Sequence, residues 1–304
     1  MSPILLGVIP VFALIALGWG LKATGFLRQE SWPPIERLAY FALYPGFLVP
    51  TIWGADFSGL SAGTAGLAAV ACVLAVGGLG VLAKPFLKQT DAAFTSVFQG
   101  LVRWNGFVFL PVVQAVFGQE GLATAAVVLG ILIPVVNVLC VLVLSRWGEG
   151  QGGGWRMVGR SLMVNPIIWS CAAGTLLNVL HVPPADPLHS TLELVGDAAI
   201  PLGLVIAGAG LSFRDAAMRP WVIGGVTAVK LVVMPLMMWG LTRLLGGDAL
   251  AQGVALCCGA APGAAASYVL ARQMGGDAPL MAGIVAFTTA GSAVTIPALL
   301  AVLT

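Results

Sequence analysis

Long apolar runs, separated by short polar connections, occupy almost the whole chain. A membrane-spanning helix needs about 20 mainly apolar residues, and by this measure the pattern predicts ten spans. They cover residues 3–21, 38–54, 61–83, 93–117, 121–145, 161–180, 190–211, 220–244, 249–271 and 278–303. The longest polar connection, residues 146–160, divides them five and five. The pattern predicts an all-α polytopic membrane protein with repeats at 1–145 and 161–304.

Composition supports a membrane protein. The 304 residues are 59% hydrophobic and 9% charged, whereas soluble domains carry about 25% charged residues. The net charge is +2 and no basic stripe is present, so we expect no nucleic-acid partner. The apolar N-terminus lacks the basic region that precedes a signal sequence. We therefore read it as the first span and expect the lipid bilayer to be the protein's surroundings.

The sequence contains no constellation typical of an enzyme or a metal site. All five cysteines lie in apolar runs without a histidine at ligand spacing, which indicates helix packing in preference to metal ligands or disulfides. The two histidines, His181 and His189, flank a loop without a nucleophile. We expect no catalytic activity and no cofactor.

The lysines and arginines give the ten spans an orientation. With the N-terminus outside, eleven of the fourteen fall in inner connections and one, Arg243, in an outer connection. The other two, Arg103 and Lys230, fall inside spans. Positive charge collects on the cytoplasmic side of membrane proteins. The sequence thus predicts an inner (plasma) membrane protein with both termini outside the cytoplasm.

The two halves of the chain carry similar features at a nearly constant offset of 156 or 157 residues. Asn105-Gly106 precedes Gly118 by the interval at which Pro262-Gly263 precedes Gly275. Pro45 in the second span similarly corresponds to Pro201 in the seventh. Since each half has an odd number of spans, the second half starts from the opposite side of the membrane. Two such halves are an inverted repeat, which is typical of secondary transporters.

The fourth and ninth spans contain residues that interrupt a helix at mid-span. In the fourth these are Arg103, Asn105, Gly106 and Pro111, and in the ninth Pro262-Gly263. Interrupted backbone at membrane depth is tolerated only around a protein-lined cavity. The N-terminal ends of the resulting half-helices carry partial positive charge that favours an anion. We predict a substrate site where the two spans cross.

Polar residues inside other spans are further candidates. A charge at the depth of Arg103 is costly and usually functional. Its side chain could attract an anion or could snorkel to the cytoplasm, and the sequence leaves both roles open. Glu193 and Asp197, four residues apart, and the mid-span Lys230 are candidates for coupling to an ion. The remaining candidate substrate contacts are Asn137, Ser267, Tyr268 and Pro45.

Six stretches along the chain form a set of motifs: GFLRQESWPPIERLAYFALYPGFLV, RWNGFVFLPVVQAVFGQEG, DAAIPLGLVIAGAGL, VKLVVMPL, GAAPGAAASYVLARQMGGD and GSAVTIPAL. Together they resemble the auxin efflux carrier family, whose bacterial members include malonate transporter-like proteins and whose plant members are PIN-type auxin exporters. The plant Asn-Pro-Asn is here Trp104-Asn105-Gly106, and the Asn that often follows the proline of the ninth span is missing.

The resemblance implies an architecture similar to sodium/proton antiporters and bile-acid transporters. Spans 1, 2, 6 and 7 would form a scaffold, and spans 3–5 and 8–10 a transport core with broken, crossing spans 4 and 9. It implies an organic anion substrate at Asn105, Gly106, Pro262 and Gly263, and a homodimer.

We therefore expect a carrier for a small mono- or dicarboxylate that works by alternating access. A sodium- or proton-coupled symporter or antiporter, a channel, and a membrane-embedded sensor are the alternatives.

Overall fold

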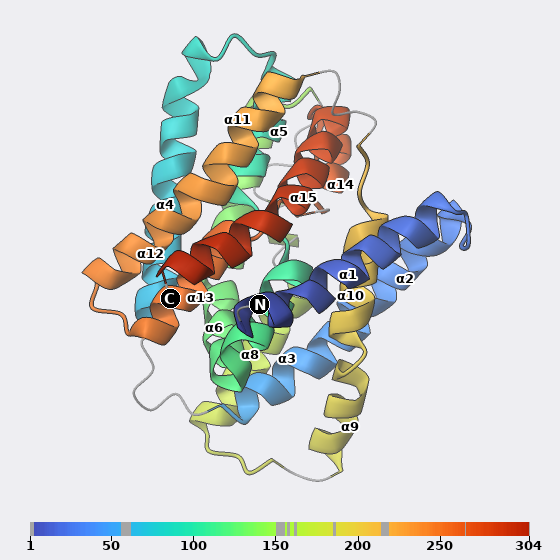
Figure 1. Cartoon of the computed structure of the whole chain (residues 1–304), viewed down its shortest axis with the longest axis vertical. Helices are drawn as coiled ribbons and strands as arrows, with labels where there is room; N and C mark the ends of the chain where they lie inside the picture. Colours follow the sequence, from blue (N-terminus) through green and yellow to red (C-terminus); the bar gives the residue numbers. More distant parts are fainter. Residues whose placement is uncertain are drawn as a thin grey trace.

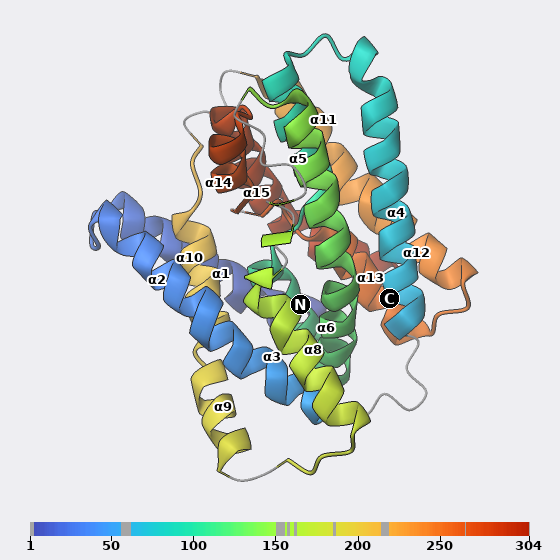
Figure 2. The ribbon, with the colours of Figure 1, turned by 180° about the vertical axis from the view of Figure 1, so that it is seen from behind.

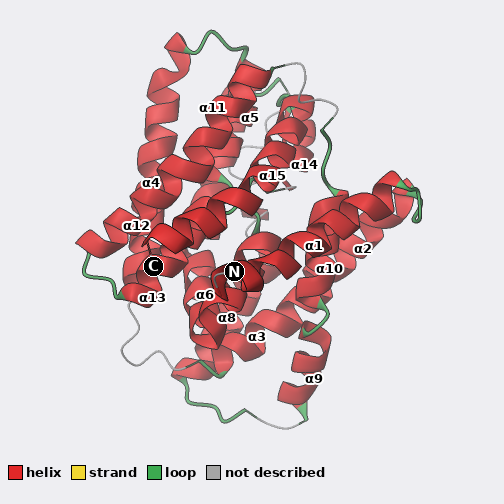
Figure 3. Cartoon of the chain, viewed as in Figure 1, coloured by secondary structure: helices red, strands yellow, loops and turns green. Residues whose placement is uncertain are grey.

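The computed structural model describes residues 3–55, 62–149, 156, 159–160, 163–184, 187–213, 219–264 and 266–303. Every regular element among them is a helix (Figure 3). The first group of α-helices is α1 (Pro3–Ala23), α2 (Trp32–Leu38), α3 (Tyr44–Trp53), α4 (Ala62–Ala83), α5 (Asp91–Val102) and α6 (Gly106–Trp147). The second group is α8 (Pro166–Val179), α9 (Leu188–Gly196), α10 (Ala199–Ala209), α11 (Pro220–Ala228), α12 (Met234–Leu244), α13 (Ala249–Ala260), α14 (Ala266–Met274) and α15 (Ala278–Leu303).

Two prolines widen the helices in which they lie. The π-helical segments η2 (Ala39–Leu43) and η5 (Val229–Val233) join α2 to α3 and α11 to α12. Pro45 and Pro235 follow them by two residues. A proline lacks the N–H for the carbonyl four residues earlier and its ring crowds that carbonyl. The wider π turn accommodates this defect, and such turns frequently mark functional sites.

A glycine divides α6 into two limbs. A continuous helix of its 42 residues would be about 63 Å long, roughly twice the thickness of the hydrocarbon core. Gly118 interrupts it with φ 65° and ψ −153°, a conformation that glycine adopts without a Cβ penalty. Gly275, which follows α14, also has a positive φ of 73°.

Five of the described segments are long and apolar enough to cross a membrane. They are Ala62–Phe86, Asp91–Trp147, Leu188–Ala209, Pro220–Leu244 and Ala278–Leu303, and shorter apolar helices lie at Gly7–Ala23, Pro166–Val179 and Ala249–Ala260. The described residues therefore form an all-helical structure typical of a multi-pass membrane protein. The finer arrangement of ten spans in an inverted repeat stays a prediction.

The helices gather in two groups on either side of the molecule. In Figure 1, α1, α2, α9 and α10 lie on one side and α4, α11 and α12 on the other, and Figure 2 shows the same division from behind. α1 packs along α10, and α3 packs against α8 and α9. On the other side, α12 packs against α4 and α13. Between the two groups, α13 packs against α6, and α14 packs against α5.

The contact between α1 and α10 depends on two glycines. A Cβ placed on Gly18 would lie 1.9 Å from the carbonyl oxygen of Val205, and one on Gly208 would lie 1.8 Å from that of Ile15. The two backbones therefore touch directly, with no room for a side chain between them. Small residues allow this close approach of helices inside a bilayer.

We predict that Gly18→Ala destabilises the protein, because its methyl group would push α1 away from α10. Overpacking of this kind costs about 1–3 kcal/mol, which a melting curve of the detergent-purified protein would show as a lower melting temperature. Gly20→Ala is the matched control, since no atom lies within 4 Å of a Cβ at that position. Equal melting temperatures for both variants would contradict the packing argument.

Candidate functional site

The two interrupted helices meet at their breaks. α5 ends at Val102, and the extended residues Arg103 and Asn105 lead into α6. α13 ends at Ala260, and α14 begins at Ala266. The backbone N–H of Asn105 donates a hydrogen bond of 2.8 Å to the carbonyl oxygen of Pro262. We call this place, residues 103–105 against 261–264, the crossover.

Each break satisfies its freed backbone groups in a different way. The Asn105 side chain caps α6, because its Oδ1 accepts from the N–H of Phe107 at 2.9 Å. On the other chain segment, the N–H of Gly263 donates to Oγ1 of Thr288 in α15 at 3.0 Å. The second break therefore takes its polar partner from a neighbouring helix. The sequence motifs gave no signal for Thr288.

A cavity of about 820 Å³ opens beside the crossover. Its polar lining residues are Glu36, Arg37, Tyr40, Arg103, Asn105, Asn137, Arg160, Asn165 and Gln273. Three arginines face one glutamate, so we call it the arginine-lined cavity. The cavity therefore has a positive balance that favours an anion.

Two side-chain hydrogen bonds hold polar groups in this cavity. The Arg103 guanidinium donates to Oδ1 of Asn137 at 3.2 Å. The Tyr40 hydroxyl donates to Oδ1 of Asn165 at 3.1 Å, and that oxygen also accepts from the N–H of Ile167 at the start of α8. These bonds orient Arg103 and Tyr40 along the cavity wall next to Asn105.

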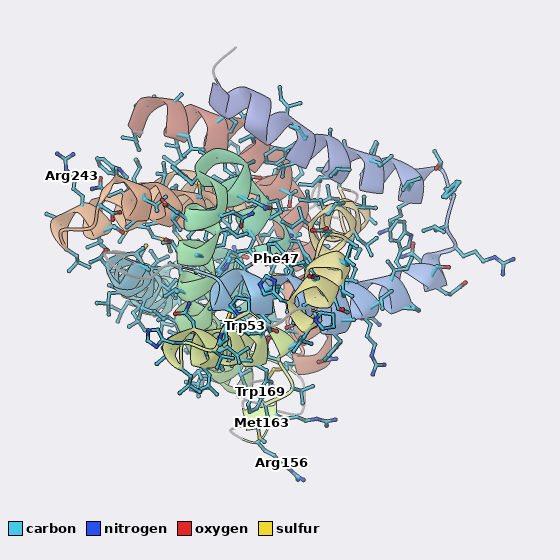
Figure 4. All side chains as sticks on the ribbon, turned by 90° about the horizontal axis from the view of Figure 1, so that it is seen from below. Phe47, Trp53, Arg156, Met163, Trp169 and Arg243 are labelled. Carbon is cyan, nitrogen blue, oxygen red and sulfur yellow. The ribbon has the colours of Figure 1, made fainter. Side chains whose placement is uncertain are left out.

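A second cavity, of about 760 Å³, lies farther along the same helices. Glu120, Glu193 and Asp197 line it together with His189 and two glutamines, so we call it the acid-lined cavity. His189 Nδ1 lies 3.4 Å from a carboxylate oxygen of Glu193, and its ring packs on Trp53. Figure 4 shows Phe47, another lining residue, and Trp53 in the middle of the molecule, with Arg156 and Arg243 at its edge.

An aromatic cluster separates the two cavities. Along α3, Tyr44 lines the arginine-lined cavity and Phe47 lines the acid-lined one. The ring of Tyr44 contacts Phe107 edge-to-face, with centroids 4.6 Å apart, and lies 6.4 Å from Phe47. Phe107 in turn fills the space above Gly203 of α10, where a Cβ would meet its ring at 2.4 Å. We call this cluster of Tyr44, Phe47 and Phe107 the partition.

The structure brings some of the predicted site residues together. Arg103, Asn105, Gly106 and Asn137 all line the arginine-lined cavity. Pro262 and Gly263 are buried beside Asn105 and present backbone groups. Glu193 and Asp197 line the acid-lined cavity instead.

Four other candidates line neither cavity. The face of α14 on the arginine-lined cavity is formed by Ala266, Val269, Leu270 and Gln273, without Ser267 and Tyr268. Tyr268 packs on Arg272 and Ser267 is buried. Neither Pro45 nor Lys230 belongs to the lining of the two cavities.

Residues that the motifs missed complete the arginine-lined cavity. Arg37 comes from the end of α2, Tyr40 from η2, and Arg160 and Asn165 from the segment before α8. In the sequence, the two arginines count only as positive charges at the ends of spans. Their approach to the crossover depends on how α2, α6 and α8 pack.

We predict that Asn105→Ala lowers the melting temperature of the protein, because it removes the acceptor that caps α6. Loss of such a cap costs about 1 kcal/mol. Asn105→Ser keeps a capping oxygen and removes only the amide, so it should melt close to the wild type. The same melting temperature for Asn105→Ala and the wild type would show that the cap does not hold the break.

The sequence is similar over most of its length to proteins that are named as transporters. Residues 155–300 match the model of the family described as membrane transport protein. A protein from Methanothermobacter thermautotrophicus named "Uncharacterized transporter" is 26% identical over 295 residues, which cover 95% of either chain. One from Rhizobium meliloti named "Putative malonate transporter" is 25% identical over 96% of this chain and 93% of its own. The chain is therefore similar to membrane transport proteins, in its second half by the family model and over most of its length by the two relatives.

Proposed function

We propose that the protein is a carrier for a small organic anion, a mono- or dicarboxylate, which binds at the crossover and is moved by alternating access. The observation that carries this proposal is the arginine-lined cavity, which ends at Arg103, Asn105 and the start of α6. The relative named as a malonate transporter supports a carboxylate as the substrate class.

The charge around the crossover favours a carboxylate. The guanidinium of Arg103 lies beside Asn105 at the N-terminal end of α6, where the helix dipole is positive. Substrate carboxylates in transporters with broken helices bind at such half-helix N-termini. A guanidinium matches the two oxygens of a carboxylate with paired donors. Arg37 and Arg160 add positive charge along the cavity.

The proposed arrangement is ten spans in two inverted repeats, with both termini outside the cytoplasm. The spans would be α1, α2–α3, α4, α5 with the first limb of α6, and the second limb of α6, followed by α8, α9–α10, α11–α12, α13–α14 and α15. Positive φ angles at Gly118 and Gly275, which close equivalent spans, support the repeat. In this orientation the arginine-lined cavity faces the cytoplasm and the acid-lined cavity faces outward.

Transport would require the partition to open, so that the crossover becomes accessible from the acid-lined cavity. In the proposed division, Phe107 belongs to the core, whereas Tyr44 and Gly203 belong to the scaffold. Movement of the core relative to the scaffold would break the contact between Tyr44 and Phe107 and open the crossover to the acid-lined cavity. An aromatic pair contributes about 0.5–1.5 kcal/mol beyond its buried area, which thermal motion can overcome.

A second candidate is a carrier of the same architecture that is coupled to protons. The acid-lined cavity favours it, because Glu193, Asp197 and Glu120 could exchange protons with the outside. Proton coupling predicts that an outside pH below the inside pH changes the rate of substrate movement, and that Glu193→Gln removes this dependence.

We expect purified protein in liposomes to exchange radiolabelled malonate, or another short carboxylate, against the same anion inside. Arg103→Gln should raise the KM about tenfold or more, since a hydrogen bond to a charged group is worth about 1.5–3 kcal/mol. Arg243→Gln, at an exposed position on α12, is the control and should transport like the wild type.

A thermal-shift screen of mono- and dicarboxylates identifies the anion to use, because a ligand of the folded state raises the melting temperature with its concentration. Transport of the selected anion by Arg103→Gln with an unchanged KM would contradict the site.

A further inference from the structure

Lys230 is a fully buried lysine in the middle of the protein. Its exposed fraction is 0%, and it lies in the π-helical segment η5 between α11 and α12. No acceptor among the described residues forms a hydrogen bond with its Nζ, and no described carboxylate forms an ion pair with it. A buried lysine must gain compensation from its surroundings, because an isolated charge in a low dielectric is very costly.

The register of the neighbouring helices places Lys230 level with the first break. Arg219, just before α11, donates to Gln89, just before α5, so both helices start at the same end of the molecule. Farther along, a Cβ on Gly100 of α5 would meet Val226 of α11 at 3.0 Å. Lys230 lies four residues, about 6 Å, beyond Val226. The same distance along α5 and beyond its end leads from Gly100 to residues 103–105 of the first break.

A second register leads to the other break. α12 and α13 are joined by a short turn and pack side by side. A Cβ on Gly259 of α13 would meet the backbone of Pro235 at 2.5 Å. Lys230 lies five residues before Pro235, in the direction in which α13 runs toward residues 261–264. η5 also packs directly against α5, α13 and α15. Lys230 therefore lies at the depth of the crossover, and it does not line the arginine-lined cavity.

At this depth two helices end with their C-termini. α5 ends at Val102 and α13 at Ala260, and the last turn of each leaves carbonyl groups without intrahelical partners. These ends carry partial negative charge. In transporters with broken helices, half-helix C-terminal ends and unwound carbonyls are the groups that coordinate Na⁺ or a proton. A positive charge is therefore required here from some source.

We propose that the Lys230 ammonium is a resident cation that compensates the C-terminal ends of α5 and α13, in the place that a bound metal cation would otherwise occupy. An ammonium group cannot ligate another cation, so Lys230 is not a coupling-ion ligand. The carrier consequently needs no sodium. This proposal deepens the proposed function. Its consequence for transport rests on that function, whereas its consequence for stability does not.

The experiment measures melting temperatures of the full-length protein in detergent at one ionic strength, in choline chloride, sodium chloride or methylammonium chloride. The wild type should melt at the same temperature in all three. Lys230→Ala should melt lower than the wild type in choline chloride. It should regain about 3 °C in methylammonium or sodium chloride, because the small cation fills the vacated position and binds only the folded state.

Lys22→Ala is the matched control, since this lysine is half-buried at the end of α1. It should show no difference between the three salts. Lys230→Arg keeps the charge and should also be insensitive to the salt. If Lys230→Ala does not fold, Lys230→Gln fills more of the space and provides the same comparison.

Two results would overturn the proposal. One is a variant without the Lys230 charge that melts at the temperature of the wild type and whose melting temperature does not change with the small cations. The other is a wild type that melts at a higher temperature in sodium than in choline. In liposomes, carboxylate exchange by the wild type should proceed equally in sodium and choline, and stimulation by sodium would also overturn it. Absence of any carboxylate exchange would count against the proposed function alone, because the melting comparison needs no substrate.

Discussion

The hydrogen bond between the N–H of Asn105 and the carbonyl of Pro262 is the contact on which the centre of the molecule depends. A helix that is interrupted inside a bilayer frees backbone donors and acceptors where water cannot bind them. Here each break supplies part of what the other lacks. The Asn105 side chain and the Thr288 hydroxyl satisfy two further N–H groups. Neither break would be stable without the opposite helix pair and α15.

This constraint also fixes where charge must lie. Once two helices stop at the same depth, their N-terminal and C-terminal ends create positive and negative poles that are close together. Arg103 at the end of α5 faces the cavity beside the positive start of α6, and their joint charge suits an anion. Lys230 is buried in η5, which packs against α5 and α13. One of the two cations thus lines the cavity, and the other lies buried outside its lining.

The sequence was sufficient for the features that depend on local chemistry. Proline and Asn-Gly interrupt helices through their own backbone, so the breaks at Asn105 and Pro262 could be predicted from the residues alone. The cavity could not, because Tyr40 and Asn165 lie 125 residues apart and meet only through packing. For α14, the sequence placed Ser267 and Tyr268 at the site. The residues that line it, Ala266, Val269, Leu270 and Gln273, follow the helical period and leave those two on other faces.

The two cavities have opposite charge, and the partition between them consists of rings with almost no polar groups. In the proposed function, a carboxylate that leaves the arginine-lined cavity would therefore lose favourable charge as it nears Glu120, Glu193 and Asp197. Such a gradient would favour binding of the anion on one side and speed its release on the other. The apolar ring contact at Tyr44 and Phe107 adds a barrier to water and ions that is independent of that gradient. A barrier made of rings can open by a small shift of α6 past α3, since no hydrogen bond joins these two side chains among the described contacts.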